Sequence, residues 1–361
     1  MPFVDPIRNF YGRFERPISS LSLISGFIFD IITLKRVDTL WENIWILGHL
    51  FIIGIFIILI HSKDNEEGDE ANPSKAHFWY VNILQFFFGG ILSTYLVFYF
   101  RSADLFSTWP FILILLLAFI ANESLKRHFI RLSFQISLFF LSIYSFMIFL
   151  VPIVLHRIGD WVFVLSGILS LIIIWFFLRI LFKFIKENKK NRKAVTLLIS
   201  GIFILVNFLY FTNMIPPMPL SLKDAGVYYN ITKNIEGNYE LMYENTGWKK
   251  YLDLYPDFNK VAGMPVYVFS AIFSPKNLNL NIIHEWQHYN EARKEWQTES
   301  VVNLPVVGGR DGGFRTYSMR SNISAGKWRV NIKTNTGKTI GHLRFNIVPA
   351  VVPPIFSVVI K

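Results

Sequence analysis

The sequence predicts an α-helical membrane bundle of about seven transmembrane helices, followed by an all-β, immunoglobulin-like sandwich domain. Of the 361 residues, 52% are hydrophobic and 17% are charged, whereas soluble domains carry about a quarter charged residues. Long apolar runs fill residues 1–215, and short runs with a period of two residues fill residues 227–361. The same composition excludes disordered, collagen-like and coiled-coil chains.

Seven apolar segments are each long enough to cross a bilayer, for which about 17–25 residues are needed. They lie near residues 18–34, 41–61, 78–99, 107–122, 129–151, 160–183 and 195–215. The first is the most amphipathic. It runs straight into further apolar segments with no small-residue cleavage site, so we expect a span and not a signal peptide.

The loops between these segments carry an uneven positive charge. If the N-terminus is cytoplasmic, the inner segments hold thirteen Lys and Arg residues and the outer loops hold four. This bias predicts a cytoplasmic N-terminus and places the residues after the seventh span on the outer side. The chain contains no cysteine, which excludes disulfides, thiolate metal sites and a cysteine nucleophile.

Two ionisable residues within the apolar segments mark a possible pathway through the bundle. Asp30 lies about one turn from the outer end of the first segment, and His49 lies in the second. Ionisable groups in a membrane interior are functional candidates, so a transporter or channel is one alternative function. The competing interpretation is that Asp30 lies close enough to the span end to pair structurally.

The chain changes character after residue 215. Residues 216–226 are rich in proline, and we predict a linker there, because proline cannot continue a helix. Alternating apolar and polar residues then predict clear strands at 266–273, 313–320, 327–334 and 339–348, and further strands near 227–233, 278–289 and 298–306. Asn335-Thr336-Gly337 predicts a tight turn between two of them. About seven short strands without a long helix favour a β-sandwich over residues 227–361.

Several motifs resemble a known module. The stretches GGRDGGFRTYSMR and GKWRVNIKTNTGKTIGHLRFNIV, with VYVFSAIF and HEW before them, resemble the bacterial domain of unknown function 2914. In the first half, GFIFDIITLKRVD, QFFFGGILSTYLVFYFRS and MIPPMPLSL resemble the multi-span region that accompanies this module. The resemblance implies a bacterial envelope protein with an outward β module, and it supplies no catalytic residues. Together with the loop charges, we therefore expect a bacterial inner-membrane protein with a periplasmic β domain.

The segment His284-Glu285-Trp286-Gln287-His288 matches the H-E-x-x-H pattern of zinc proteases. That chemistry needs a helix, which brings both histidines to one face. The preceding residues alternate as in a strand, where the Cα atoms of His284 and His288 would lie roughly 13 Å apart. A strand also places Glu285 on the opposite face. A zinc-dependent hydrolase therefore remains an alternative, and the strand interpretation is favoured.

Two further groups are candidate ligand-binding residues. Arg310 and Asp311 stand among four glycines at 308–313, where exposed backbone N–H groups and an arginine could hold an anion; the competing interpretation is a purely structural turn. Arg315, Tyr317, Arg329 and Lys333 lie on neighbouring predicted strands, with Trp286 and Trp296 nearby in sequence. Arginine beside aromatic rings suits sugars, anionic polymers or lipid head groups, whereas we expect Trp328 in the core.

The function that these patterns favour is non-enzymatic. We expect the outer domain to recognise a cell-envelope component, which is a glycan, a lipid head group or a partner protein, while residues 1–215 anchor it in membrane lipid. No catalytic residue and no cofactor is predicted. Nucleic acid is not an expected partner, because the domain has no dense run of Lys and Arg.

Overall fold

The protein is described from a computed structural model that covers residues 24–34, 36–67, 75–102, 104–124, 131–185, 189–245 and 253–361. The chain divides into two compact units. The first comprises residues 1–100 and 108–215, and the second comprises residues 101–107 and 216–361. The first unit is helical and the second is built of β-strands.

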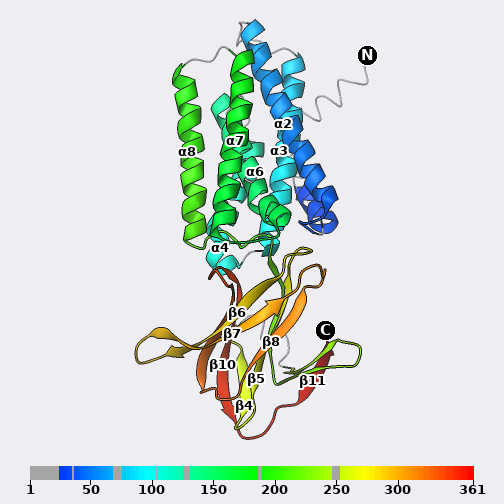
Figure 1. Ribbon diagram of the computed structural model, residues 1–361, viewed down its shortest axis with the longest axis vertical. Helices are drawn as coiled ribbons and strands as arrows, with labels where there is room; N and C mark the ends of the chain where they lie inside the picture. Colours follow the sequence, from blue (N-terminus) through cyan, green and yellow to red (C-terminus); the bar gives the residue numbers. More distant parts are fainter. Residues whose placement is uncertain are drawn as a thin grey trace, which may run out of the picture. The chain divides into compact units, whose positions relative to one another are not determined.

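Seven helices are found in the described part of the first unit (Figure 1). They are a short helix Ile24–Thr33, α2 (Leu40–Glu67), α3 (Lys75–Ser102), α4 (Leu105–Ser124), α6 (Leu132–Leu155), α7 (Asp160–Phe184) and α8 (Lys189–Phe211). Within five of these helices lie segments long and apolar enough to cross a membrane: Leu40–Ser62, Trp79–Ser102, Leu132–Leu155, Asp160–Phe184 and Asn191–Phe211.

Two of the seven predicted spans are not among these five. The apolar helix of the fourth is Phe106–Asn122, and the described part of the first holds the helix Ile24–Thr33. Residues 18–23 of the first predicted span lie outside the described residues, as do the basic positions before them and residues 186–188 of the basic loop. Five apolar helices of spanning length are therefore shown where seven were predicted.

Helix α6 is the centre of the helical unit. It packs against α2, α7 and α8, and most of its side chains from Leu132 to Pro152 are buried. The hydroxyls of Tyr95 and Tyr99, on successive turns of α3, donate hydrogen bonds of 2.8 Å to the carbonyls of Ser142 and Ser145. These bonds give the two buried hydroxyls hydrogen-bond partners in an apolar interior.

The strands of the second unit form three sheets. The first sheet has the order β1-β5-β8, the second β4-β10-β9-β6-β7 and the third β11-β3-β2. Their bounds are β1 Ser221–Tyr228, β2 Asn230–Lys233, β3 Tyr239–Glu244, β4 Asp257–Val261, β5 Val266–Phe273, β6 Leu280–Asn290, β7 Glu295–Val306, β8 Phe314–Arg320, β9 Gly326–Thr334, β10 Thr339–Ala350 and β11 Phe356–Ile360.

The sheet domain is confirmed, but its layout differs from the prediction in two ways. Its strands form three sheets, whereas an immunoglobulin-like sandwich has two. Strand β1 begins at Ser221, inside the segment 216–226 that we predicted as a linker. The prolines end at Pro219, so the residues after it have free N–H groups and pair antiparallel with β5.

Strand β5 is buried on both faces, and this makes its sheet the middle layer. Val266 and Val268 belong to the core shared with the five-stranded sheet, which includes Trp286 and Trp328. Phe269 and Ala271, on the other face of β5, pack with Leu241 of the third sheet. The outer face of the five-stranded sheet is left to polar and part-buried side chains, and it carries the candidate site.

Candidate functional site

A cationic and aromatic surface covers the outer face of the five-stranded sheet. On β9, Lys327, Arg329, Asn331 and Lys333 alternate with the inward side chains of Trp328, Val330 and Ile332. The neighbouring strands extend the row, because Arg344 of β10 lies opposite Arg329 and Gln287 of β6 lies opposite it on the other side. We call Tyr255, Tyr289, Trp296, Lys327, Arg329 and Arg344 the cation–aromatic face.

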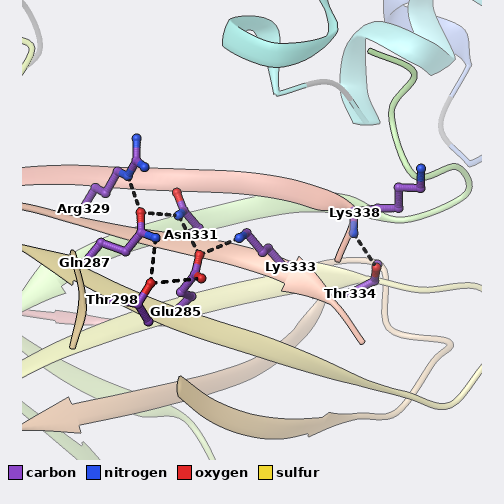
Figure 2. Close-up of polar contacts among 8 residues, drawn as sticks. All are labelled: Glu285, Gln287, Thr298, Arg329, Asn331, Lys333, Thr334 and Lys338. Carbon is purple, nitrogen blue, oxygen red and sulfur yellow. Dashed lines mark hydrogen bonds and ion pairs between the residues drawn. The ribbon is translucent and has the colours of Figure 1, made fainter. Parts of the chain in front are cut away.

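A polar network holds the centre of this sheet face in place (Figure 2). Glu285 accepts from Lys333 Nζ at 2.5 Å and from Asn331 Nδ2 at 2.9 Å. Gln287 accepts from Asn331 at 3.1 Å and from Arg329 Nε at 2.5 Å, and it donates to Thr298 at 2.9 Å. These hydrogen bonds fix the orientation of the Asn331 and Gln287 side-chain amides. Gln287 in turn orients the Arg329 guanidinium.

The same network decides the charge of Glu285. Partial burial raises the pKa of this carboxyl, but the hydrogen bonds from Lys333 and Asn331 lower it by more, so its pKa is below the usual range. Glu285 is thus ionised and paired with Lys333. Glu285 still raises the pKa of Arg329 through its charge, but its ion pair is with Lys333.

The aromatic rings of the face contact the cations directly. The Arg329 guanidinium lies 4.4 Å from the centre of the Trp296 ring, and Tyr255 stacks on Trp296 at 6.3 Å with an angle of 13°. Lys327 Nζ lies about equally far from Tyr255, at 6.0 Å, and from Tyr289, at 5.8 Å. Cation–π contacts of this length hold the side chains against the rings and leave their N–H edges available.

The H-E-x-x-H segment lies on strand β6 and not on a helix. As the alternation predicts, His284 and His288 lie opposite Ile332 and Trp328 of β9, while Glu285 is on the other face. His288 Nε2 lies 3.2 Å from the Ala325 carbonyl oxygen, which can only accept, and the ring lies against that of Trp328. Among the described residues, no group of three or more His, Cys, Asp or Glu side chains is placed to hold a metal ion.

His284 is instead a fully buried link between two sheets. Its Nε2 lies 2.9 Å from Ser270 Oγ of β5, and its Nδ1 lies 2.9 Å from Ser318 Oγ of β8. Trp286 Nε1 also donates to Ser318, at 3.0 Å. A serine beside a histidine suggests nucleophilic catalysis, but His284 and Ser270 are 0% exposed, so a substrate has no access to either.

The glycine-rich segment around Arg310 and Asp311 forms the turn between β7 and β8. Both side chains are exposed. A Cβ added to Gly308 would stand 1.9 Å from the Pro275 carbonyl oxygen, and Gly313 has a φ of 84°. Gly308 is therefore required because the backbone of Pro275 is so close, and Gly313 because its conformation is left-handed. These are structural reasons for the glycines of this turn.

The distributed arginine–tyrosine group is divided between two sheets, which corrects our placement of its members on neighbouring strands. Arg315 and Tyr317 lie on β8 of the first sheet. There Arg315 donates to Asn238 at 3.1 Å, and Tyr317 contacts Tyr239. Arg329 and Lys333 lie on β9 of the five-stranded sheet, and Trp286 is in the core, as is Trp328, which we predicted there.

The helical unit brings the two predicted intramembrane candidates near each other. Ser93 of α3 donates to Asp30 at 2.5 Å. His49 is buried on α2, its Nδ1 lies 2.9 Å from the Trp45 carbonyl, and a Cβ on Gly90 would stand 3.2 Å from its Nε2. The space beside Gly90 of α3 is thus occupied by the His49 ring.

Four members of the cation–aromatic face were not among the predicted site residues: Tyr255, Tyr289, Lys327 and Arg344. Alternation places Lys327 of β9 on the side opposite Trp328 and Arg344 of β10 on the side opposite Phe345, and that pattern could have revealed both. Tyr255 precedes β4, and Tyr289 lies near the end of β6, opposite Trp296 across the short β6–β7 turn. The approach of both tyrosines to Lys327 joins segments that are distant in sequence, so no local pattern indicates it.

Comparison with solved structures gives weak likenesses. Two crystal structures of a β-glucosidase from Listeria innocua, with glucose and with gluconolactone, each align with a TM-score of 0.20 at 9% identity, covering 32% of this chain and 17% of theirs. The alkylpurine DNA glycosylase AlkC of Pseudomonas fluorescens, bound to DNA, aligns with a TM-score of 0.22 at 8% identity, covering 86% of this chain and 99% of that one. Likenesses at this level carry no argument about fold or function.

The family comparison concerns the strands that carry the site. Curated proteins provide no match to this chain. Residues 279–347, from the start of β6 through most of β10, match the family described as "Protein of unknown function (DUF2914)". The C-terminal part of the chain therefore carries a DUF2914 domain.

Proposed function

We propose that this chain is an integral protein of a bacterial inner membrane whose DUF2914 domain binds a glycan of the cell envelope, without catalysis, on the outer face of the five-stranded sheet. Five apolar helices of spanning length support the membrane location. The excess of Lys and Arg in alternate loops supports a cytoplasmic N-terminus and a periplasmic domain.

The observation that carries the binding proposal is the cation–aromatic face. Tyr255 and Tyr289 each contact Trp296, all three rings are part-exposed, and Lys327 and Arg329 lie against them. The C–H-bearing face of a sugar ring is apolar and slightly positive, which suits the negative face of an aromatic ring. The polar network beneath it supplies oriented amide and guanidinium groups for sugar hydroxyls.

Neither alternative function, zinc-dependent hydrolysis or transport, is supported by a group of residues comparable to the cation–aromatic face. The zinc-hydrolase interpretation requires both histidines to approach one ion, and His284 is enclosed between two sheets with both ring nitrogens at hydrogen-bonding distance from serines. The transporter interpretation rests on Asp30, Ser93 and His49, a small group beside one helix crossing. The sheet face offers more accessible and more varied recognition chemistry than either.

Binding of soluble glycans to the full-length protein in detergent tests this proposal. In the Trp296→Ala variant we expect affinity for a bound glycan to fall about tenfold or more, because the ring is a central contact and each 1.4 kcal/mol is tenfold. Isothermal titration calorimetry measures the change. Tyr317→Ala, which removes a part-exposed aromatic ring from a different sheet, is the matched control and should bind as the wild type does. Equal binding by wild type and Trp296→Ala, or no glycan binding at all, would refute the proposal.

A further inference from the structure

Two arginines of the cation–aromatic face lie directly opposite each other. Arg344 of β10 is paired in register with Arg329 of β9, so both side chains leave the sheet on the same face. Directly opposed residues in an antiparallel pair have Cβ atoms about 4.5–5.5 Å apart, and like charges there destabilise the sheet. The pKa of Arg329 is lowered, first by burial and also by the charge of Arg344, while Tyr255 and Glu285 act in the opposite direction.

Neither arginine has an anionic partner in the described part of the chain. The side chain of Arg344 makes no hydrogen bond or ion pair there, and its Nε is buried without an acceptor. Arg329 gives its Nε to the neutral Gln287 oxygen and forms no ion pair with the described carboxylates. The nearby Glu285 is engaged by Lys333, and Asp257, at the edge of the sheet, accepts from Asn346. A guanidinium carries five donors, so the pair retains several that no described group uses.

The aromatic rings keep both guanidinium groups in place. Arg329 lies over Trp296 at 4.4 Å, and Arg344 lies 4.3 Å from the centre of the Phe106 ring of α4 and 5.8 Å from that of Tyr255. Trp296 and Tyr255 are themselves nearly parallel. Two guanidinium groups that lie against aromatic rings, neither in an ion pair with a described carboxylate, are an arrangement suited to an oxyanion joined to a ring that can stack.

We infer that Arg329 and Arg344 form a subsite for the carboxylate of an acidic sugar, so that the ligand of this face is an acidic glycan. The inference rests on the proposed glycan-binding function and names the class of glycan. The carboxylate relieves the repulsion between the two arginines and accepts from their N–H edges. The sugar ring that carries it lies against Trp296 and Tyr255.

Oligogalacturonate and its fully methyl-esterified form test the inference, because the two share their sugar rings and differ in charge. We expect the full-length protein in detergent to bind the acid form at least tenfold more tightly than the ester. Arg329→Gln and Arg344→Gln should each remove most of that preference. Arg315→Gln, on the other sheet and bonded to Asn238, is the matched control and should retain it.

Thermal unfolding without glycan separates a binding role from a structural one. Since the Arg344 side chain makes no hydrogen bond in the described structure, Arg344→Gln should unfold at the wild-type temperature or higher. The variant should also lose the stabilisation that oligogalacturonate gives the wild type. A lowered melting temperature in its absence would assign Arg344 a structural role and overturn the inference.

The remaining outcomes distinguish the inference from the function on which it rests. Equal binding of the acid and the ester, still sensitive to Trp296→Ala, would overturn the acidic subsite and leave glycan binding intact. Displacement of the oligomer by inorganic phosphate at an equal concentration of anionic groups would show that a free anion suffices, and would overturn the assignment to a sugar. Binding of neither oligomer would overturn the inference, and the glycan panel would then decide the function separately.

Discussion

At the scale of single residues, His284 shows how a buried polar side chain joins two sheets. Both of its ring nitrogens lie 2.9 Å from serine hydroxyls, one on β5 and one on β8. Burial lowers its pKa from 6.5 to about 4, because charging the ring inside the core would cost its hydration. The neutral ring therefore holds the serines, and its protonation opposes folding.

This pKa predicts a loss of stability in mild acid. The unfolded chain takes up the proton near pH 6.5, and the folded chain does so only near pH 4. Stability that is fully present above pH 6.5 should thus decrease as the pH falls toward 4, by about 3 kcal/mol in total from this group. Urea unfolding of the full-length protein, followed by near-ultraviolet circular dichroism at pH 7 and pH 4.5, measures the loss. In His284→Gln, which cannot be protonated, the acid-dependent part should shrink; an unchanged pH dependence would contradict the assignment.

At the scale of elements, the turn between β7 and β8 shows why a glycine-rich motif need not be a binding loop. Gly308 lies so close to the chain at Pro275 that a side chain has no room. Gly309 N donates to the Ser274 carbonyl at 2.9 Å, and Gly313 N donates to the Arg310 carbonyl at 3.1 Å. The turn is therefore joined to the end of β5 by its backbone, and its glycines serve that junction.

Gly308 and Gly312 provide a matched pair of substitutions for this turn. Gly308→Ala should destabilise the β domain by about 1–3 kcal/mol, as overpacking does, because its Cβ would stand 1.9 Å from a backbone oxygen. Gly312→Ala meets nothing within 4 Å and should be neutral or slightly stabilising. The urea midpoint of each full-length variant gives the difference. Equal midpoints would show that the turn is not packed as described.

At the scale of the whole molecule, the chain separates into a helical unit and a sheet unit with different composition. The polar and charged residues of the sheet unit are spread over its strands, whereas those of the helical unit gather in its loops. If the helices cross a membrane, the positive loops remain cytoplasmic. The proposal then places the DUF2914 domain on the opposite side from residues 186–193.

The absence of cysteine makes this topology directly measurable. Ser321→Cys introduces one thiol at an exposed position of the β domain, and Asn188→Cys introduces one in the basic loop. In spheroplasts, a membrane-impermeant maleimide should label Ser321→Cys and leave Asn188→Cys unlabelled until detergent is added. The reverse pattern would place the DUF2914 domain in the cytoplasm and remove the cell-envelope glycan as its ligand.

Local sequence patterns predicted the elements whose periodicity is strong. The strand predicted at 266–273 is β5, and those predicted at 313–320 and 327–334 match β8 and β9 within one residue at each end. Strands β3, β4 and β11 were not predicted. Leu241 of β3, for example, is buried because β11 and β2 flank it, and neither neighbour can be identified from the residues beside it.

By itself, the sequence determined that a helical half precedes a strand-rich half, that His284 lies on a strand, and that Arg329 and Lys333 share a face of β9. These properties follow from the side-chain periods of helix and strand, which depend on consecutive residues. The tertiary structure alone decided that the strands form three sheets, that Arg315 and Tyr317 lie apart from Arg329, and that Arg344 and Tyr255 join it. Strand pairing is a contact between distant segments, and the free energy that selects it comes from burial of both partners, which no single segment contains.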